Sequence, residues 1–504
     1  MRLPFPERVS YTIVCAFAIV LCTIQIYQQT APLFSLCCFF FIIVAAIAFN
    51  VAGGMTRPSG AYIFFFSVLA VIIGLCWKAI LGEPADSNLT TPILTSEVYL
   101  GSICSMLVAA FISKRFTTKE AFLARFVTDN NLQTATIGCL VTGLVIDAIS
   151  TVVPQGTASF LSALRQINHF YPMVVFLGTI HAIRRSGGTR SISFPVLLAG
   201  GLMFVEGVLG FSKEGMITPG VAWVLAVAAQ RYKLSVGQIA GMILAAAFLF
   251  YYLVPYSQYG RNFQTRSRSE NISTSLSMLG NLGKVRHDYE QNLSTVTDND
   301  LVAGYFTTHQ GFFDRLQMIG PDDSLNEFTN QGAVAGITPV YLYFINLIPH
   351  FIWKDKPSFG GGNFYAHQMG QLSDDDEGGT GISFSPASES YHLLRWTGTL
   401  LLLPALLITL FTLFDSLCGD VRKSPWGLLM VLAFAHTAPE GGLGGMIYVM
   451  GYGTLGLFFT AITATYLMPI LGDIVVGPNS KMVGFRDPLR INPRETIASQ
   501  RSAS

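Results

Sequence analysis

The chain has 504 residues, of which 51% are hydrophobic and only 12% are charged, and its mean hydropathy is +0.49. Soluble proteins carry about 25% charged residues, so this composition excludes a cytosolic enzyme, a disordered chain and a coiled coil. The formal net charge of +1 comes from 31 basic and 30 acidic residues, so only the placement of the charges is informative. The composition predicts an all-α polytopic membrane protein.

Apolar stretches of about 20 residues are long enough to cross a bilayer as helices. The first such stretch has no small-residue cleavage site, and a second follows it at once, so we do not expect a removable signal peptide. We predict twelve transmembrane helices, at 10–30, 32–53, 61–81, 97–113, 133–153, 169–184, 191–211, 215–230, 235–256, 397–417, 426–445 and 446–468.

Lys and Arg collect in alternate connections between the predicted helices, as they do on the cytoplasmic side of membrane proteins. The short connections on the other side contain few basic residues. This alternation predicts that both termini are cytoplasmic and that 471–504 is a cytoplasmic tail. The basic residues assigned to the inner side are Arg2, Arg8, Arg57, Lys114, Arg115, Lys119, Arg125, Arg184, Arg185, Arg190, Arg231, Lys233, Arg422, Lys423, Lys481, Arg486, Arg490, Arg494 and Arg501.

The twelve predicted helices divide the chain into nine helices over 1–256 and three over 397–470, separated by a large loop at 257–396. The alternation places this loop outside the cytoplasm. Its apolar stretch at 338–353 is interrupted by Pro349 and is short for a crossing. We predict an interfacial or re-entrant helix there, because a full crossing would invert every later segment.

Ionisable residues inside predicted spans are costly and often functional. On the predicted orientation they lie in the outer half of their helices or at the outer ends, although polar residues at helix ends also reach water without having a function. The clustering predicts a working site beneath the large loop. These residues are Lys78, Asp147, Glu206, His436 and Glu440 within the spans and Lys213 and Glu214 at the outer ends of two spans, whereas His181, near an inner end, is an exception.

The sequence contains no phosphate-binding loop of the G-x-x-x-x-G-K-[ST] type. A reaction outside the cytoplasm therefore needs a substrate that arrives activated, and a lipid-linked pyrophosphate sugar fits. Such a reaction needs cations to stabilise the departing pyrophosphate and a base to take a proton from a sugar hydroxyl. Arg suits the first task because its planar group binds two phosphate oxygens.

Several residues on the outer side are candidates for these roles. His309 and Arg315 lie among aromatic residues of the loop, and Lys213 with Glu214 forms a charged break between two spans. The start of the loop is basic, which also suits a solvated segment after a helix. The candidates for pyrophosphate or substrate binding are Arg165, Lys213, Glu214, Arg261, Arg266, Arg268, Lys354 and Lys356.

Metal chemistry is not expected from this sequence. The acidic run at 374–377 offers oxygen ligands for a divalent cation, but neighbouring Gly and Ser residues favour a solvated turn. The eight cysteines lie in the spans or at their ends, which argues against a disulfide framework and a Cys-based metal site. We predict no cofactor.

Three stretches resemble motifs of bacterial oligosaccharide repeat-unit polymerases, the O-antigen and exopolysaccharide polymerases. Residues 348–357 resemble the P-R-x-x-W-P-D-K-P stretch of their long outer loop. Residues 381–398, which include Glu389, resemble the G-x-x-x-x-x-x-E-x-Y-x-x-x-G-x-x-G passage into their next span. Residues 211–216, which include Lys213, resemble their S-(K/R)-x-x-(M/L) break.

The resemblance implies a GT-C-like glycosyltransferase of the bacterial inner membrane, with about twelve transmembrane helices and one large periplasmic loop. It would polymerise lipid-linked repeat units by metal-independent, inverting transfer from polyprenyl pyrophosphate. The implied partners are polyprenyl-pyrophosphate-linked oligosaccharides, the lipid bilayer, and a flippase and chain-length regulator of the same pathway, with no nucleic acid.

By the same resemblance, Lys213 would face pyrophosphate or sugar, and Glu389 would be a polar anchor or a base. Lys354 and Lys356 would line the rim of the loop. The expected catalytic residues are therefore Glu389 and the two loop residues named above, His309 and Arg315.

The sequence departs from the family pattern at His350, where Arg is usual, and at Leu394-Arg395, where Phe-Gly is expected. Two alternatives stay open. An O-antigen ligase would use similar donors with a different acceptor. A lipid-oligosaccharide flippase or transporter would suit twelve spans, but such proteins usually contain paired inverted repeats, and this sequence has no corresponding halves.

Overall fold

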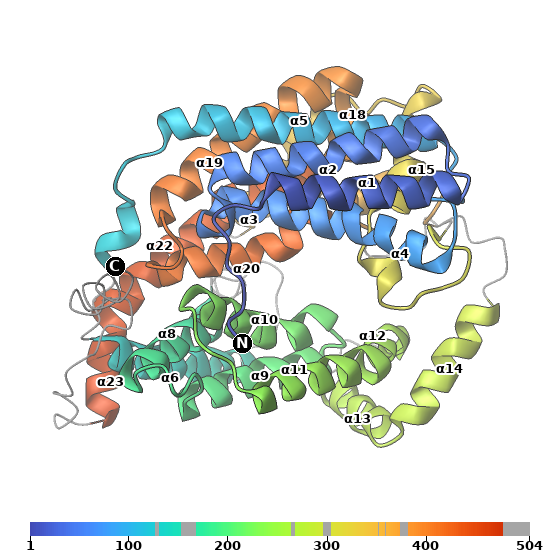
Figure 1. Cartoon of the computed structure of the whole chain (residues 1–504). Coiled ribbons are helices and arrows are strands. Elements are labelled where there is room, and N and C mark those ends of the chain that lie inside the picture. The colour runs from blue at the N-terminus through green and yellow to red at the C-terminus, as the bar shows by residue number, and fades with distance from the viewer. Residues whose placement is uncertain are drawn as a thin grey trace, which may run out of the picture.

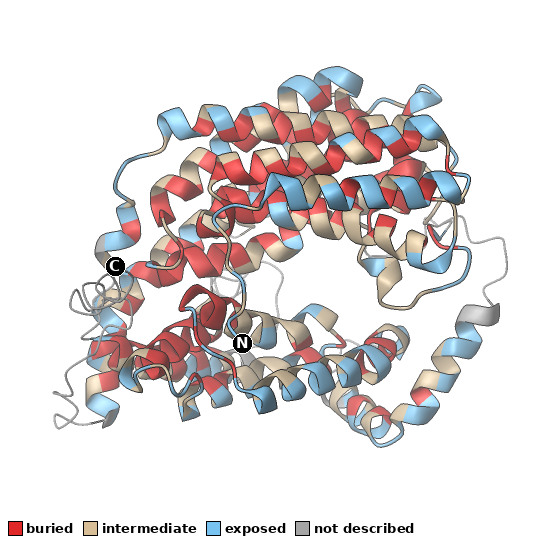
Figure 2. Ribbon diagram, viewed as in Figure 1, coloured by how far each residue is buried: buried red, intermediate tan, exposed pale blue. Residues whose placement is uncertain are grey.

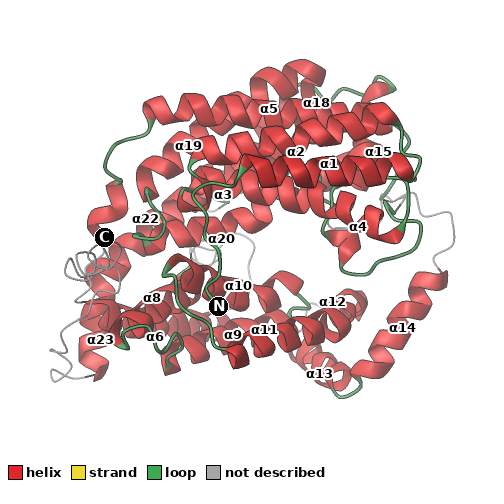
Figure 3. Ribbon diagram, in the orientation of Figure 1, coloured by secondary structure: helices red, strands yellow, loops and turns green. Residues whose placement is uncertain are grey.

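All regular secondary-structure elements are helices over the residues that the computed structural model describes, which are 1–126, 131–152, 168–263, 268–295, 304–350, 352–357, 359–372 and 382–476. Figure 3 shows helices joined by loops, with no strand in these ranges. The α-helices are α1 (Tyr11–Tyr27), α2 (Pro32–Ala52), α3 (Pro58–Phe65), α4 (Ile73–Leu81), α5 (Pro92–Phe116), α6 (Leu132–Val152), α8 (Phe170–Arg185), α9 (Phe194–Leu209), α10 (Lys213–Ala229), α11 (Val236–Phe248), α12 (Val254–Gly260), α13 (Arg268–Leu279), α14 (Leu282–Thr295), α15 (Ile319–Asn330), α16 (Thr338–Asn346), α17 (Gly361–Gln368), α18 (Pro386–Thr397), α19 (Leu403–Cys418), α20 (Pro425–Glu440), α21 (Gly442–Tyr448), α22 (Thr454–Ile462) and α23 (Met468–Val476).

Several of these helices run on without a break through π-helical segments. The segments are η2 (Phe66–Ile72), η5 (Leu249–Leu253), η8 (Gly398–Leu402), η9 (Val449–Gly453) and η10 (Thr463–Leu467). Short 3₁₀ turns include η6 (Arg261–Phe263) and η7 (Phe313–Arg315). A helix lies at each of the twelve positions where the sequence predicts a crossing.

Seven helices within the described residues are long and apolar enough to cross a membrane. Two more, Tyr11–Tyr27 and Phe194–Leu209, are apolar but shorter. The prediction of an α-helical multi-pass membrane protein is therefore confirmed in its class. The seven long helices are Pro32–Ala52, Pro58–Leu81, Pro92–Phe116, Leu132–Ile149, Val236–Phe263, Pro386–Cys418 and Gly442–Val475.

The helices form two groups, and one group lies above the other in the view of Figure 1. The upper group contains α1 to α5, α15 and α18 to α20, and the lower group contains α6, α8 to α14 and α23. Helix α20 joins the groups, because it packs against α3 on one side and against α8 and α10 on the other.

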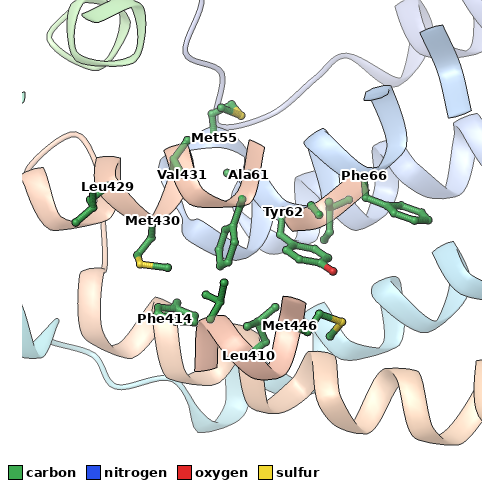
Figure 4. Packing of buried hydrophobic residues seen from close by; sticks show 14 of the residues in the cluster. Met55, Ala61, Tyr62, Phe66, Leu410, Phe414, Leu429, Met430, Val431 and Met446 are labelled. Carbon is green, nitrogen blue, oxygen red and sulfur yellow. The ribbon is translucent and has the colours of Figure 1, made fainter. Parts of the chain in front are cut away.

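The centre of the upper group is an apolar core of aromatic and methionine side chains (Figure 4). Tyr62 of α3 is fully buried there and makes edge-to-face contacts with Phe411 and Phe434, at ring-centroid distances of 5.8 and 5.3 Å. Such aromatic pairs stabilise a core beyond their area burial. Figure 2 shows this buried centre. In the lower group, by contrast, α11 lies at the edge and has no buried residue.

Helix α15 of the large loop is fixed to the start of α5. Asp323 accepts hydrogen bonds from the backbone N–H groups of Thr90 (2.6 Å) and Thr91 (3.1 Å) and from the Thr95 hydroxyl (2.8 Å). A carboxylate at a helix N-terminus satisfies backbone donors that otherwise lack partners. Its neighbour Asp322 accepts from the Ser385 N–H (2.9 Å) and so ties α15 to the start of α18.

The helices at both ends of the large loop extend past the predicted boundaries. The helix that begins at Val236 continues to Phe263, and the helix that ends at Cys418 begins at Pro386. The second of these is interrupted at Leu394 and Arg395, whose backbone is not helical (φ 50° and ψ −139° at Arg395), so the part that follows the interruption begins close to the predicted start at 397. That backbone conformation strains every residue except glycine, and it falls where the polymerase motif that the sequence resembles has glycine.

The predicted interfacial or re-entrant segment contains α16, which covers only nine residues, Thr338–Asn346. This length is well below the roughly 20 residues of a crossing. Helix α16 packs against α21, which begins the long apolar helix Gly442–Val475. Whether it sits in the interface or re-enters the membrane stays a prediction.

Candidate active site

A pocket of about 290 Å³ lies where the large loop meets α20 and α21. Two carboxylates, Glu389 and Glu440, and three tyrosines, Tyr343, Tyr365 and Tyr448, line it. A concave site with apolar rings and a few converging polar groups is the usual form of a small-molecule site. The rest of the lining is glycine-rich and includes Gly361, Gly362, Gly441, Gly442, Gly444 and Gly445.

Glu389 lies at the buried base of this pocket and is only 3% exposed. Its Oε1 accepts hydrogen bonds from the hydroxyl groups of Tyr343 and Tyr365, the latter at 3.1 Å. Its Oε2 accepts one from the Leu443 N–H at 2.5 Å. Both oxygens are therefore engaged, as a buried carboxylate requires. Of the two roles that the sequence suggested for Glu389, these contacts favour the anchor.

Glycine is required in the pocket wall because of how closely the wall approaches Glu389 and Tyr343. A Cβ at Gly442 would collide with Glu389 Oε2, and Gly442 also has φ 58°. A Cβ at Gly361 would collide with the Tyr343 hydroxyl, and one at Gly444 would collide with its ring. The glycine cluster at 441–445 therefore lets the turn after α20 approach the anchor.

Glu440 is the more accessible carboxylate of the pocket, with a side chain that is 38% exposed. Its Oε1 lies 2.7 Å from Nδ1 of His436, one turn earlier on α20. Within the described part of the chain, no other hydrogen bond or ion pair engages the Glu440 carboxylate. Glu440 therefore faces the pocket with one oxygen held and the other available.

Lys213 begins α10, two residues before the predicted span at 215–230. The turn that precedes it is fixed by Phe211, which is fully buried at φ 48° and packs where Gly260 has no side chain. The Phe211 carbonyl accepts hydrogen bonds from Ser257 Oγ (2.6 Å) and Arg261 Nε (3.4 Å). These contacts hold the first residues of α10 beside the start of the loop.

Arg315 is held by aromatic stacking on two other helices. Phe313 stacks on Trp77 of α4, with ring centroids 3.6 Å apart and planes 6° apart. Phe312 stacks on Phe250 of η5, at 4.3 Å between centroids. This double stacking fixes the short turn η7, in which Arg315 is exposed. The sequence shows these aromatics next to Arg315 but gives no sign of their partners.

The charged groups of these segments act on one another. Burial, and to a smaller extent the nearby Arg315 and Arg261, lower the pKa of Lys213 to about 7, while Glu440 opposes the change. The structure thus brings together three of the predicted cations, Lys213, Arg261 and Arg315, and places them in electrostatic reach of the pocket carboxylate Glu440. We refer to these three residues as the cation cluster.

The cation cluster has no carboxylate partner at ion-pair distance among the described residues. Positive groups that repel one another are unfavourable unless a negative charge offsets them. A phosphate or diphosphate group would offset them and would receive charge-assisted hydrogen bonds. The arrangement therefore suits an anionic ligand next to a polar pocket.

His309 lies on the exposed side of the same loop turn. Its Nδ1 is 3.8 Å from Asp314 Oδ2, and its side chain is 50% exposed. Asp314 in turn accepts a hydrogen bond from the Gln310 N–H at 2.9 Å. Burial raises the pKa of Asp314, and this backbone hydrogen bond opposes the rise. His309 does not line the pocket.

The two lysines of the loop rim differ in their surroundings. Lys354 is exposed. Lys356 is only 8% exposed, and its Nζ donates to the carbonyl groups of Asn346 (2.8 Å) and Ile348 (2.6 Å). A cation at these carbonyls stabilises the C-terminus of α16, so its contacts give Lys356 a structural role.

The remaining predicted residues are less informative. Glu214 is exposed and lies within electrostatic range of His436. Arg165, Arg266 and the acidic run at 374–377 lie outside the described residues, as does the side chain of Arg268. All eight cysteines are free thiols. Within the described ranges, no group of three or more His, Cys, Asp or Glu residues is placed to hold a metal ion.

Sequence reasoning did not assign the three tyrosines to the site, because in an apolar chain they read as core residues. It noted His436 and Glu440 as ionisable residues in a span without giving them roles. Their i, i+4 spacing on one helix was an available signal.

No protein-family model, curated protein or solved structure matches the chain.

Proposed function

We propose that this protein polymerises lipid-linked oligosaccharide repeat units on the outer face of a bacterial inner membrane. The growing glycan leaves its polyprenyl pyrophosphate and joins the next lipid-linked unit. In this proposal the chain crosses the membrane twelve times in a GT-C-like arrangement, both termini are cytoplasmic, and the large loop is periplasmic.

One observation carries the proposal, namely that the cation cluster lies within electrostatic range of Glu440, which lines the pocket of carboxylates and tyrosines. The cluster suits the pyrophosphate of the donor, because Arg and Lys give strong charge-assisted hydrogen bonds to phosphate oxygens. The pocket suits a sugar, because carboxylate and tyrosine groups offer both donors and acceptors. A substrate with a sugar joined to a pyrophosphate would occupy both at once.

The roles of the residues follow from this placement. Lys213, Arg261 and Arg315 bind the pyrophosphate and stabilise the negative charge that develops on it as the glycosidic bond to it breaks. Glu389 holds Tyr343, Tyr365 and the turn at Leu443 in place. The lipid tail remains in the bilayer beside the apolar helices, so only the head group has to reach the site.

The test is deletion of the gene in its host, followed by analysis of glycan length. A polymerase deletion should yield glycans with a single repeat unit, and long chains should return with the wild-type protein. Full-length free polymer that is no longer attached to its acceptor would indicate a ligase-type transferase instead. Normal attached chains in the deletion strain would contradict the proposal.

A further inference from the structure

We propose that Glu440 is the general base of this site, with His436 as its positioning residue. The inference rests on the proposed glycosyl transfer and assigns the proton-accepting step, for which sequence reasoning had considered His309 and Glu389. It starts from the different surroundings of the carboxylates and the histidine that lie in or near the pocket.

Glu389 is poorly suited to accept a proton from a substrate. Its two oxygens already accept hydrogen bonds from Tyr343, Tyr365 and Leu443, and it is 3% exposed. A proton on either oxygen would break or reverse one of these bonds and leave a buried donor without its partner, which is costly.

His309 is poorly placed for the same step. Half of its side chain is exposed, and it lines no part of the pocket. A general base has to come within hydrogen-bond reach of the proton that it takes. His309 therefore fits the outer surface of the loop turn better than the reacting centre.

Glu440 meets both requirements. It lines the pocket suited to a sugar, and its charge acts on Lys213 of the cation cluster, which suits a pyrophosphate. One oxygen is held by His436 Nδ1 at 2.7 Å. The other has no partner among the described residues and can accept a hydroxyl proton.

The step is balanced in atoms and charge. The acceptor sugar hydroxyl gives its proton to the Glu440 carboxylate while its oxygen forms a bond to the anomeric carbon of the donor. The bond between that carbon and the pyrophosphate oxygen breaks, and the electron pair leaves with the pyrophosphate beside Lys213, Arg261 and Arg315. The proton then passes from Glu440 to water.

His436 would act through Glu440 and not on the substrate. Its contact fixes the carboxylate rotamer at the end of α20, where the turn into Gly441 and Gly442 begins. A base held in one orientation contributes more to the rate than a mobile one, because the geometry of proton transfer is set in advance.

The experiment uses the full-length protein in lipid nanodiscs. The substrate is polyprenyl-pyrophosphate-linked repeat units extracted from a host strain that lacks this protein. We expect Glu440→Gln to lower kcat for chain extension by about 10² to 10⁴-fold, the usual contribution of a general base, with little change in KM. Glu440→Asp, which keeps the carboxylate, should retain intermediate activity. Farnesyl pyrophosphate binding at pH 6 should stay within about threefold of wild type, because the cation cluster remains.

Glu290→Gln is the matched control, since Glu290 is also an exposed carboxylate in an i, i+4 pair, with Arg286 at 2.7 Å. It should extend chains at the wild-type rate. His436→Leu should lower kcat, and His436→Asn, which keeps a donor near the Nδ1 position, should restore much of it. These two variants also test the assignment if Glu440→Gln does not fold.

Extension by Glu440→Gln at the wild-type rate would overturn the assignment of the base and leave the proposed function intact. If Glu440→Gln does not fold, the other two variants decide. A wild-type kcat in both Glu440→Asp and His436→Leu would then overturn the assignment of Glu440 as the base. Absence of any extension by the wild-type protein would overturn the proposed function and this assignment together.

Discussion

The backbone N–H of Leu443 donates a 2.5 Å hydrogen bond to Glu389 Oε2, although the two residues are 54 positions apart. This bond joins the end of the large loop to the turn between α20 and α21. The same turn carries Glu440, so the buried anchor determines where the exposed carboxylate lies. In our proposal the anchor is Glu389 and the base is Glu440, whereas the sequence offered Glu389 for either role.

The glycine turn gives the first prediction. Gly442→Ala adds a Cβ that collides with Glu389 Oε2 at a residue with φ 58°, and it should destabilise the protein by about 2 kcal/mol or more, as strained buried sites usually do. Thermal unfolding of the purified protein measures this. Gly241→Ala is the control, because a Cβ at Gly241 meets nothing within 4 Å. Equal unfolding temperatures for the two variants would contradict the prediction.

The second prediction concerns pH. Since the pKa of Lys213 is lowered to about 7, its amine is charged below that pH and neutral above it. Farnesyl pyrophosphate binding should therefore weaken as the pH rises from 6 to 8.5, by about tenfold, because a hydrogen bond from a charged group contributes about 1.5–3 kcal/mol. Bound pyrophosphate favours the charged amine, which moves the decline to higher pH.

The matched variant for this titration is Lys213→Met, which has no ionisable group at this position. Its affinity should be lower at pH 6 and should lack the part of the pH dependence that Lys213 causes. Ionisation of the ligand itself affects both proteins equally. Parallel binding curves for wild type and Lys213→Met would show that Lys213 does not contact the pyrophosphate.

The kink in α18 gives a third prediction. Arg395 adopts a backbone conformation that favours glycine, and among the described residues its side chain makes one long hydrogen bond, of 3.5 Å, to the Thr329 carbonyl. Arg395→Gly should be about 1 kcal/mol more stable than Arg395→Ala, because both lose that contact but only glycine relieves the strain. Chemical or thermal unfolding distinguishes them. An alanine variant at least as stable as the glycine variant would exclude strain at this position.

The fourth prediction tests which side of the membrane the large loop occupies. Ser277 of α13 and Lys233 between α10 and α11 are both exposed and fall on opposite sides in the proposed topology. In a variant with the eight native cysteines replaced, Ser277→Cys should react with a membrane-impermeant maleimide added to intact cells, and Lys233→Cys should react only after lysis. The reverse pattern would place the proposed site on the cytoplasmic side.

Helix positions were predictable because they depend on local sequence. The stretch predicted at 32–53 is α2, Pro32–Ala52, which begins with a proline in its first turn and ends at Gly53 with φ 97°. Both are common helix boundary signals. The charge pattern and the long apolar runs likewise follow from residues close together in the chain, so the membrane class could be inferred directly.

The pocket was less predictable, because it depends on contacts between distant segments. Tyr343 and Tyr365 lie in a loop where aromatic residues also suit a folded core, and only the structure places both hydroxyl groups on Glu389. The turn that contains Arg315 is fixed by the stacking of Phe313 on Trp77, a residue far away in the sequence. No local pattern predicts such a pairing.

The most direct test of the central claim is the stoichiometry of the reaction in proteoliposomes that contain only this protein and extracted lipid-linked repeat units. Glycan length and free polyprenyl pyrophosphate are measured in the same sample over time. The account predicts that chains lengthen and that one polyprenyl pyrophosphate is released for each new glycosidic bond. Unchanged chain length, or lengthening without release of polyprenyl pyrophosphate, would contradict it.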